Sequence, residues 1–221
     1  MRNLAALAII LIAVFAGIIF FYSRGGAPEN MKELAAVEVK EYNGKDLSSV
    51  SDFRENSIKG PQHVDAKDYC LKVSGLAGEP REYTYDQVLT RQRYTKVVTL
   101  NCVEGWSVTL LWEGVLAREL IADSKPLPAA KTVIFHAYDG YTTSFPLDYI
   151  MKNDIILAYK MNNVTLPPER GFPFQLVAES KWGYKWVKWV TEIELSDDVN
   201  YQGYWESRGY SNTGNLNESF F

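Results

Sequence analysis

The chain has 221 residues, of which 47% are hydrophobic, 23% charged and 14% aromatic, a composition typical of one or two globular domains rather than of a disordered or collagen-like chain. Its 23 basic and 27 acidic side chains give a net charge of −4, which argues against a nucleic-acid-binding protein because such proteins normally have a basic surface. With only 2 cysteines and 2 histidines, a zinc ribbon, an iron–sulfur carrier or a three-histidine metal site is nearly excluded.

The N-terminal region contains a run without any charge, from Leu4 to Tyr22. As a helix this run would be about 28 Å long, close to the roughly 30 Å of a bilayer's hydrocarbon core. We therefore expect residues 1–24 to be a signal-anchor that spans the cell membrane once and leaves the rest of the chain on the extracytoplasmic side. The alternative is a cleaved and exported signal peptide, but its apolar region would be unusually long and no small-x-small cleavage site follows it.

The remaining chain divides by composition into three parts. Residues 25–50 mix charged and polar side chains, and we expect them to form a tether that leads through an irregular entry into the domain. Residues 51–210 show apolar and β-branched runs separated by short helical segments, which predicts one β-rich α+β domain. Residues 211–221 are then a C-terminal tail.

Strands and short helices alternate along this domain. The predicted strands are residues 69–76, 96–101, 132–138, 141–145, 174–178 and 186–195, and the predicted helices are residues 84–89, 116–122 and 146–151. Thr84 and Gln87 have capping-box spacing at the start of the first helix. Asp139-Gly140 between two strands predicts a type I′ hairpin turn. Alternation along 186–195 places Lys188 on the polar face of the last strand.

Cys102 follows a predicted strand and precedes Gly105, which lets the backbone approach a ligand closely. Cys70 lies inside another predicted strand. Three interpretations remain open from the residues alone. The cysteines are buried apolar side chains or form one disulfide; Cys102 is a nucleophile with His63 or His136 as its base, although no known cysteine-hydrolase signature surrounds it; or Cys102 is a thiolate ligand of a soft metal.

Several short sequence blocks between residues 50 and 210 are informative because of the order in which they follow one another. They are CVEGWS (102–107), WEGV (112–115), DGY (139–141), RGFPFQLV (170–177), KWGYKWVKW (181–189) and GYWESRGY (203–210). Taken together they resemble the molybdopterin-binding catalytic domain of the sulfite oxidase superfamily. The resemblance implies a sulfite-oxidase-type molybdopterin-binding fold and, as cofactor, molybdenum with one molybdopterin, or tungsten with the same pterin.

The resemblance also implies roles for particular residues. Cys102 matches the cysteine that binds the metal, so it is the expected metal ligand and catalytic residue. Glu104 is similar to a glutamate of the methionine sulfoxide reductase branch, where a carboxylate beside the metal can relay protons; the alternative is a glutamate bonded to turn amides. Trp186, Val187 and Lys188 match the phosphate-contacting triplet, with Lys188 binding the phosphate as a point charge. Taken alone, Lys188 fits a solvated lysine equally well.

The chain departs from the family pattern at other expected cofactor contacts. Gln175 stands where an arginine is usual, and it can form hydrogen bonds but cannot pair with a phosphate charge. Arg170 either supplies the missing charge or is a surface arginine. Ala137 replaces a threonine-type contact and leaves only its backbone. Asn56 is the best candidate in the N-terminal segment, which matches least well.

Other side chains near these blocks are less informative. Lys181 and Lys185 are expected to be exposed. Trp106, Tyr141 and Trp182 either line a substrate entrance or pack in the core.

The resulting prediction is a membrane-anchored oxidoreductase that transfers an oxygen atom and two electrons, reductase-like on a small S- or N-oxide. One alternative is an oxidase of sulfite-like anions, which would need arginines around the metal; another is a cofactor-free, membrane-tethered binding module. Neither histidine has the context of a haem attachment site. We therefore expect electrons to be exchanged with a separate protein, such as a membrane cytochrome or a quinone-linked subunit.

Overall fold

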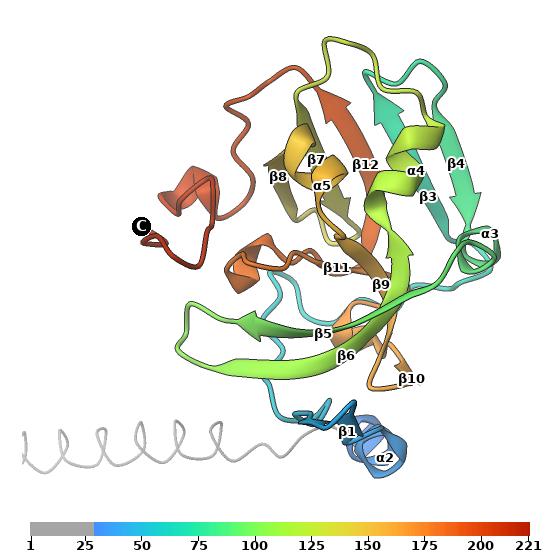
Figure 1. The fold of residues 1–221 in the computed structure, drawn as a ribbon, viewed down its shortest axis with the longest axis vertical. Coiled ribbons are helices and arrows are strands. Elements are labelled where there is room, and N and C mark those ends of the chain that lie inside the picture. Colours follow the sequence, from blue (N-terminus) through green and yellow to red (C-terminus); the bar gives the residue numbers. More distant parts are fainter. Residues whose placement is uncertain (1–28) are drawn as a thin grey trace, which may run out of the picture.

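The computed structural model describes residues 29–221 (Figure 1). The predicted membrane span of residues 1–24 lies outside the described residues. Within the described part of the chain, no helix has both the length and the apolar character needed to cross a bilayer.

One sheet is antiparallel and contains the strand before Cys102. Its order is β10-β9-β6-β5, with β11 also paired to β9. The strands are β5 (Tyr94–Asn101), β6 (Ser107–Leu116), β9 (Ile156–Met161), β10 (Val164–Thr165) and β11 (Gln175–Val177). The sequence did not predict β6 or β9, because both strands are largely buried on both faces and lack alternation. Gly114 allows β6 to touch β9, since a Cβ there would lie 2.2 Å from the Leu157 carbonyl oxygen.

The second sheet has the order β4-β3-β12-β7-β8, and only β3 and β12 run parallel. Its strands are β3 (Cys70–Gly75), β4 (Arg81–Thr84), β7 (Thr132–Ala137), β8 (Thr142–Pro146) and β12 (Val190–Ser196). The first half of the predicted strand 186–195 is wrong. Trp189 has a φ of +52°, and its buried indole donates to the Pro168 carbonyl at 2.7 Å. The backbone conformation at Trp189 is therefore determined by this buried contact and not by the alternation of a strand.

Short helices cover the sheets much as predicted. They are α3 (Tyr85–Leu89), α4 (Ala117–Asp123) and α5 (Leu147–Lys152), together with the 3₁₀ helices η1 (Pro168–Arg170), η2 (Gly183–Lys185) and η3 (Glu206–Arg208). The capping box of α3 is confirmed: the Gln87 N–H donates to the Thr84 hydroxyl oxygen at 3.3 Å, and the Thr84 N–H donates to the Gln87 amide oxygen at 2.9 Å. These elements confirm a β-rich α+β fold.

The segment expected to be an irregular tether is ordered where the structure describes it. It forms α2 (Glu29–Val37) and a small hairpin of β1 (Glu41–Tyr42) and β2 (Lys45–Asp46). Glu38, which is 8% exposed, accepts hydrogen bonds from the Val50 N–H at 2.9 Å and the Asn162 amide at 2.8 Å. Because Asn162 lies between β9 and β10, this buried carboxylate fixes the N-terminal segment to the first sheet.

Candidate active site

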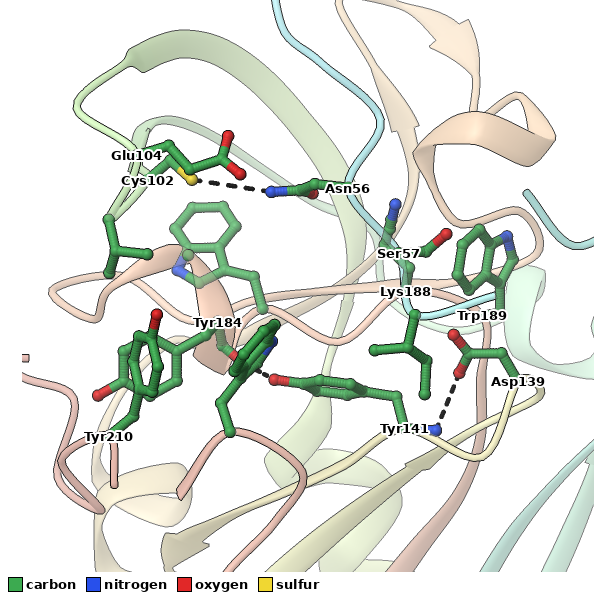
Figure 2. Close-up of a pocket in the computed structure, with 15 residues that line it drawn as sticks. Asn56, Ser57, Cys102, Glu104, Asp139, Tyr141, Tyr184, Lys188, Trp189 and Tyr210 are labelled. Carbon is green, nitrogen blue, oxygen red and sulfur yellow. Dashed lines mark hydrogen bonds between the residues drawn. The ribbon is translucent and has the colours of Figure 1, made fainter. Parts of the chain in front are cut away.

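A cleft forms where turns of the two sheets meet the segments before β3 and β12. It consists of a cavity of about 170 Å³ and a smaller one of about 40 Å³ beside it. Five residues line both cavities: Asn56, Cys102, Gly183, Trp186 and Lys188. Figure 2 shows Cys102 and Glu104 on one side of the larger cavity and Asp139 and Trp189 on the other.

The turn between β5 and β6 presents Cys102 to the cleft. The Cys102 N–H donates to the Trp106 carbonyl at 2.9 Å, and the Gly105 N–H donates to the Cys102 carbonyl at 3.1 Å. Gly105 has a φ of +87°, a conformation that strongly favours glycine. These bonds define a three-residue loop that ends in a glycine bulge, so the turn itself fixes where the cysteine lies.

The turn between β7 and β8 has the same geometry and lines the same cavity. The Ala137 N–H donates to the Tyr141 carbonyl at 2.9 Å, and the Gly140 N–H donates to the Ala137 carbonyl at 3.0 Å. Gly140 has a φ of +88°, but Asp139 does not have a positive φ, so the predicted type I′ turn is wrong. The reason is the Asp139 carboxylate, which accepts the Tyr141 N–H at 2.9 Å and stabilises the three-residue loop.

The Cys102 thiol is buried, with 6% of the residue exposed, and the Asn56 amide nitrogen lies 3.7 Å from its sulfur (Figure 2). Burial raises the pKa of this thiol; the charge of Glu104 also raises it, while the Asn56 hydrogen bond lowers it. A metal cation would offset the cost of the buried thiolate. This environment suits a metal ligand better than a free nucleophile.

A disulfide and a histidine-activated nucleophile are not supported. Cys70 and Cys102 are both free thiols, so the predicted disulfide alternative is wrong. Neither His63 nor His136 lines the two cavities, and the His136 ring is bonded to Glu194 at 2.8 Å. No histidine base therefore accompanies the Cys102 thiol.

Glu104 lies at the solvent-exposed rim of the larger cavity. Its carboxylate accepts the Trp106 indole N–H at 2.9 Å, rather than the turn amides that the alternative interpretation requires. A carboxylate at this position contacts both the cavity and bulk water, so it can carry a proton between them.

Lys188 lies between the two cavities, and its ammonium donates to the Glu55 carboxylate at 2.5 Å. The same carboxylate oxygen accepts the Ser57 N–H at 3.0 Å. Burial lowers the pKa of Lys188, whereas the charge of Glu55 raises it. Gly171 makes room for the lysine stem, since a Cβ there would lie 3.0 Å from the Lys188 Cβ. The alternative of a solvated lysine is therefore not supported, and Lys188 lines both cavities.

Arg170 and Gln175 line the smaller cavity. Arg170 is 4% exposed, and its guanidinium donates to the carbonyls of Val50 at 3.0 Å and Phe53 at 2.6 Å, so it is not a surface arginine. Burial lowers the pKa of Arg170 to about 10. The buried amide oxygen of Gln175 has no hydrogen-bond partner.

These residues fit a metal that brings a polar organic ligand of its own. Between residues 29 and 221, no group of three His, Cys, Asp or Glu side chains could hold a metal ion, so a metal on Cys102 needs further ligands from a cofactor. The buried oxygens of Ser57 and Gln175 lack partners and line the two cavities, where a ligand's N–H groups could satisfy them. A molybdopterin, with its dithiolene sulfurs, pterin N–H groups and phosphate, has this chemistry.

Comparison with known proteins agrees. Residues 58–205 match the family described as "Oxidoreductase molybdopterin binding domain". The chain belongs to this family. It is therefore an oxidoreductase domain whose cofactor is molybdenum with molybdopterin, which confirms the cofactor and enzyme predictions and argues against a cofactor-free binding module.

The chain is similar to several named members of this family. It is 34% identical over 155 residues to the uncharacterized oxidoreductase YuiH of Bacillus subtilis, covering 70% of this chain and 78% of that protein. It is 31% identical to a putative protein-methionine-sulfoxide reductase subunit, YedZ1, of Azospira oryzae, covering 68% of this chain and 57% of that protein. The sulfane dehydrogenase SoxCD of Paracoccus pantotrophus has the same fold, with a TM-score of 0.64 at 22% identity, covering 86% of this chain and 57% of that chain.

Within this oxidoreductase domain, two of the predicted cofactor contacts do not line either cavity. Trp186 lines both cavities, but Ala137 and Val187 are buried and line neither. The backbone of Ala137 is used by its own turn, and the Val187 carbonyl accepts the Leu176 N–H at 2.8 Å. Their backbone groups are therefore already engaged in the fold.

The prediction that Lys181 and Lys185 are exposed is wrong: they are 6% and 0% exposed. The Lys185 ammonium donates to the buried Glu206 carboxylate at 2.7 Å, and that of Lys181 donates to Asn215 at 2.5 Å. Both partners lie in the last 20 residues, which fold back over η2.

The sequence did not identify the other polar and aromatic residues of the larger cavity. Of the three uncommitted aromatic residues, Tyr141 lines the larger cavity, Trp106 lines the smaller one, and Trp182 lines neither. The polar and aromatic cavity residues that sequence reasoning missed are Ser57, Asp139, Tyr184, Trp189, Trp205 and Tyr210. Asp139-Gly140-Tyr141 repeats the turn pattern of Glu104-Gly105-Trp106, and this signal could have found Asp139.

Proposed function

We propose that this domain reduces a small uncharged S- or N-oxide by transferring its oxygen atom at the cofactor. The observation that carries the proposal is the charge of the larger cavity. Its lining includes two carboxylates, Glu104 and Asp139, and its one lysine, Lys188, is paired with Glu55; of the described residues, no arginine lines it. Such a lining disfavours an oxyanion and tolerates a neutral, dipolar oxide.

The residues of the cleft would hold the cofactor from both ends. Cys102 would bind the metal, and Asn56 beside it would donate to the sulfur. Lys188 has three N–H donors, of which Glu55 takes one, so the others remain for the phosphate of the pterin. Gln175 would accept from the pterin ring system, and Arg170 would hold the surrounding backbone rather than the phosphate.

In the proposed reaction a sulfoxide, two electrons and two protons give a sulfide and one water. When bound, the cofactor supplies the two-electron chemistry and accepts the oxygen atom. The chain orients the cofactor, excludes water from the buried thiolate and moves protons. Glu104 is the proposed proton carrier because its carboxylate reaches both solvent and cavity.

An oxidase of sulfite-like anions is the second candidate. Two arginines, Arg54 and Arg170, line the smaller cavity. However, the guanidinium of Arg170 already donates to the carbonyls of Val50 and Phe53, and this leaves less of its charge for a substrate. The geometry therefore supports reduction over oxidation.

We also propose that residues 1–24 anchor the domain in the cell membrane, with the domain on the extracytoplasmic side, and that a separate electron-transfer protein supplies the electrons. The charge-free run from Leu4 to Tyr22 supports the anchor. The relative YedZ1 is named as a putative reductase subunit, which is consistent with a partner protein.

Metal analysis tests the cofactor site directly. We expect about one molybdenum per purified chain, and at least tenfold less in Cys102→Ser because the metal loses its protein thiolate. Cys70→Ser is the matched control and should keep the metal. Equal metal content in Cys102→Ser and the wild type would contradict the assignment of Cys102.

Substrate assays test the direction of the reaction. With a reduced dye as electron donor, the wild type should reduce dimethyl sulfoxide, methyl phenyl sulfoxide or trimethylamine N-oxide, and Glu104→Gln should lower kcat by about tenfold or more and change its pH profile. Sulfite oxidation without any oxide reduction would support the second candidate and overturn the proposal.

A further inference from the structure

The C-terminal segment, residues 197–221, folds back from β12 and supplies part of the larger cavity's wall; we call it the C-terminal strap (Figure 1). It contributes Trp205 and Tyr210 to the cavity. The family match runs to residue 205, so it includes Trp205 and ends five residues before Tyr210.

The strap is fixed to the domain at several points. Gly203 packs directly on β8, because a Cβ there would lie 2.2 Å from the Thr142 carbonyl oxygen. The buried pair of Lys185 and Glu206 follows three residues later, at 2.7 Å. Beyond Tyr210, the Trp182 N–H donates to the Gly214 carbonyl at 2.8 Å. Contacts on both sides of Tyr210 hold its ring in place before any ligand arrives.

The wall presents aromatic rings rather than polar groups. The Tyr210 ring lies 5.1 Å from that of Trp205 and packs edge-on against Tyr184 at 5.2 Å. The hydroxyls of Tyr184 and Tyr141 donate to the carbonyls of Ser211 and Tyr184, which directs these polar ends into the protein (Figure 2). The rings that remain offer an apolar surface.

We infer that Trp205 and Tyr210 bind the apolar substituent of the substrate, so that the domain prefers a sulfoxide that carries an aromatic group to one that carries only methyl groups. This inference rests on the proposed function, which places the oxide oxygen at the metal near Cys102. An aromatic substituent offers the wall a flat apolar ring to pack against, whereas the methyl groups of dimethyl sulfoxide offer much less apolar surface. Tyr210 is a specificity-determining residue in this view.

Kinetics on two substrates test the inference in the cofactor-loaded protein. The ratio of kcat/KM for methyl phenyl sulfoxide over dimethyl sulfoxide should fall by about three- to tenfold in Tyr210→Ala, mainly through KM for the aromatic substrate. Tyr210→Phe keeps the ring and should keep the ratio. Tyr42→Ala, which removes a partly exposed tyrosine from β1, is the matched control and should change nothing.

Binding of methyl phenyl sulfone, which is shaped like the substrate but is not expected to be reduced, gives a second readout without turnover. Its Kd, measured through tryptophan fluorescence, should rise by the same factor in Tyr210→Ala. If the Kd of the sulfone rises in Tyr210→Ala but no sulfoxide is reduced, the proposed function is wrong, while the assignment of Tyr210 to an aromatic binding surface is supported. If sulfoxides are reduced while Tyr210→Ala leaves both the ratio and the Kd unchanged, the inference is overturned. Where alanine lowers the thermal midpoint, Tyr210→Leu replaces it in both measurements, because it fills part of the same volume.

Discussion

Two lysines in one short segment, Lys185 and Lys188, have opposite surroundings. The side chains of Lys185 and its partner Glu206 are both 0% exposed, and Glu206 belongs to the C-terminal strap that covers the lysine. Lys188 and its partner Glu55 keep 15% and 23% of their side-chain surface exposed and face the cleft. Both pairs join the same segment to a distant part of the chain. The first pair is inaccessible to any ligand and serves the fold, whereas the second offers a cation to one.

Removing the buried lysine should have the largest effect on stability. Lys185→Met leaves the Glu206 carboxylate buried without its counter-charge, in a site where one of its oxygens already lacks a partner. The free energy of unfolding should fall by about 3–5 kcal/mol, as measured by urea denaturation. The double variant Lys185→Met/Glu206→Leu removes both charges and should recover at least half of this loss. A loss below about 1 kcal/mol in the single variant would show that the pair is not buried.

Removing the cleft lysine should affect the cofactor more than the fold. Lys188→Ala leaves Glu55 near water, so the free energy of unfolding should fall by only about 1 kcal/mol. Loss of a charged hydrogen bond to the phosphate, about 1.5–3 kcal/mol, should reduce retained molybdopterin roughly tenfold or more. Lys188→Arg keeps the charge and should retain more cofactor than alanine does, and Lys72→Ala on the exposed face of β3 is the control. If Lys188→Ala kept its full cofactor content, the assignment of Lys188 as a cofactor-binding residue would be wrong.

The local sequence does not distinguish these two lysines. Both lie in the block KWGYKWVKW (181–189); Lys188 was assigned from alternation and resemblance, whereas Lys185 was expected to be exposed. Lys185 is buried because Glu206 reaches it from 21 residues away and because Gly214 lies against its stem, where a Cβ would be 2.6 Å from the Lys185 Cγ. Such long-range contacts cannot be read from the spacing of residues along the chain.

The places of the glycine turns and the capped start of α3 were predicted because their causes are local, although the type of the turn at Asp139-Gly140 was not. Gly105 and Gly140 mark the two hairpin turns of the cleft, and Thr84 begins a helix with its own capping box. β6 and β9 were missed because strands buried on both faces lack alternation. The candidate site shows the same difference between local and long-range causes. Cys102 on its turn could be predicted, but the positions of Trp205 and Tyr210 depend on the path of the C-terminal strap.

A third lysine under the strap, Lys181, extends the comparison to pH. Its pKa is lowered to about 8, mainly by burial and also by the charge of Lys185, against an opposing effect of the Glu218 charge. The folded protein therefore loses this proton above pH 8, whereas the unfolded chain keeps it up to about pH 10.4. Between these values the unfolded state binds more protons, so the contribution of Lys181 to stability rises with pH.

The measurement compares wild type with Lys181→Met in urea denaturation from pH 7 to 10. The wild type should gain about 1 kcal/mol relative to the variant between pH 8 and 10, a modest gain because the ammonium also donates to the Thr213 carbonyl at 3.0 Å and to Asn215. Taking the difference cancels the titration of the tyrosines, which both proteins share. A difference that stays flat across this range would mean that Lys181 keeps its proton. The strap would then cover two buried ammonium groups, and the contrast with Lys188, which faces the cleft, would be sharper still.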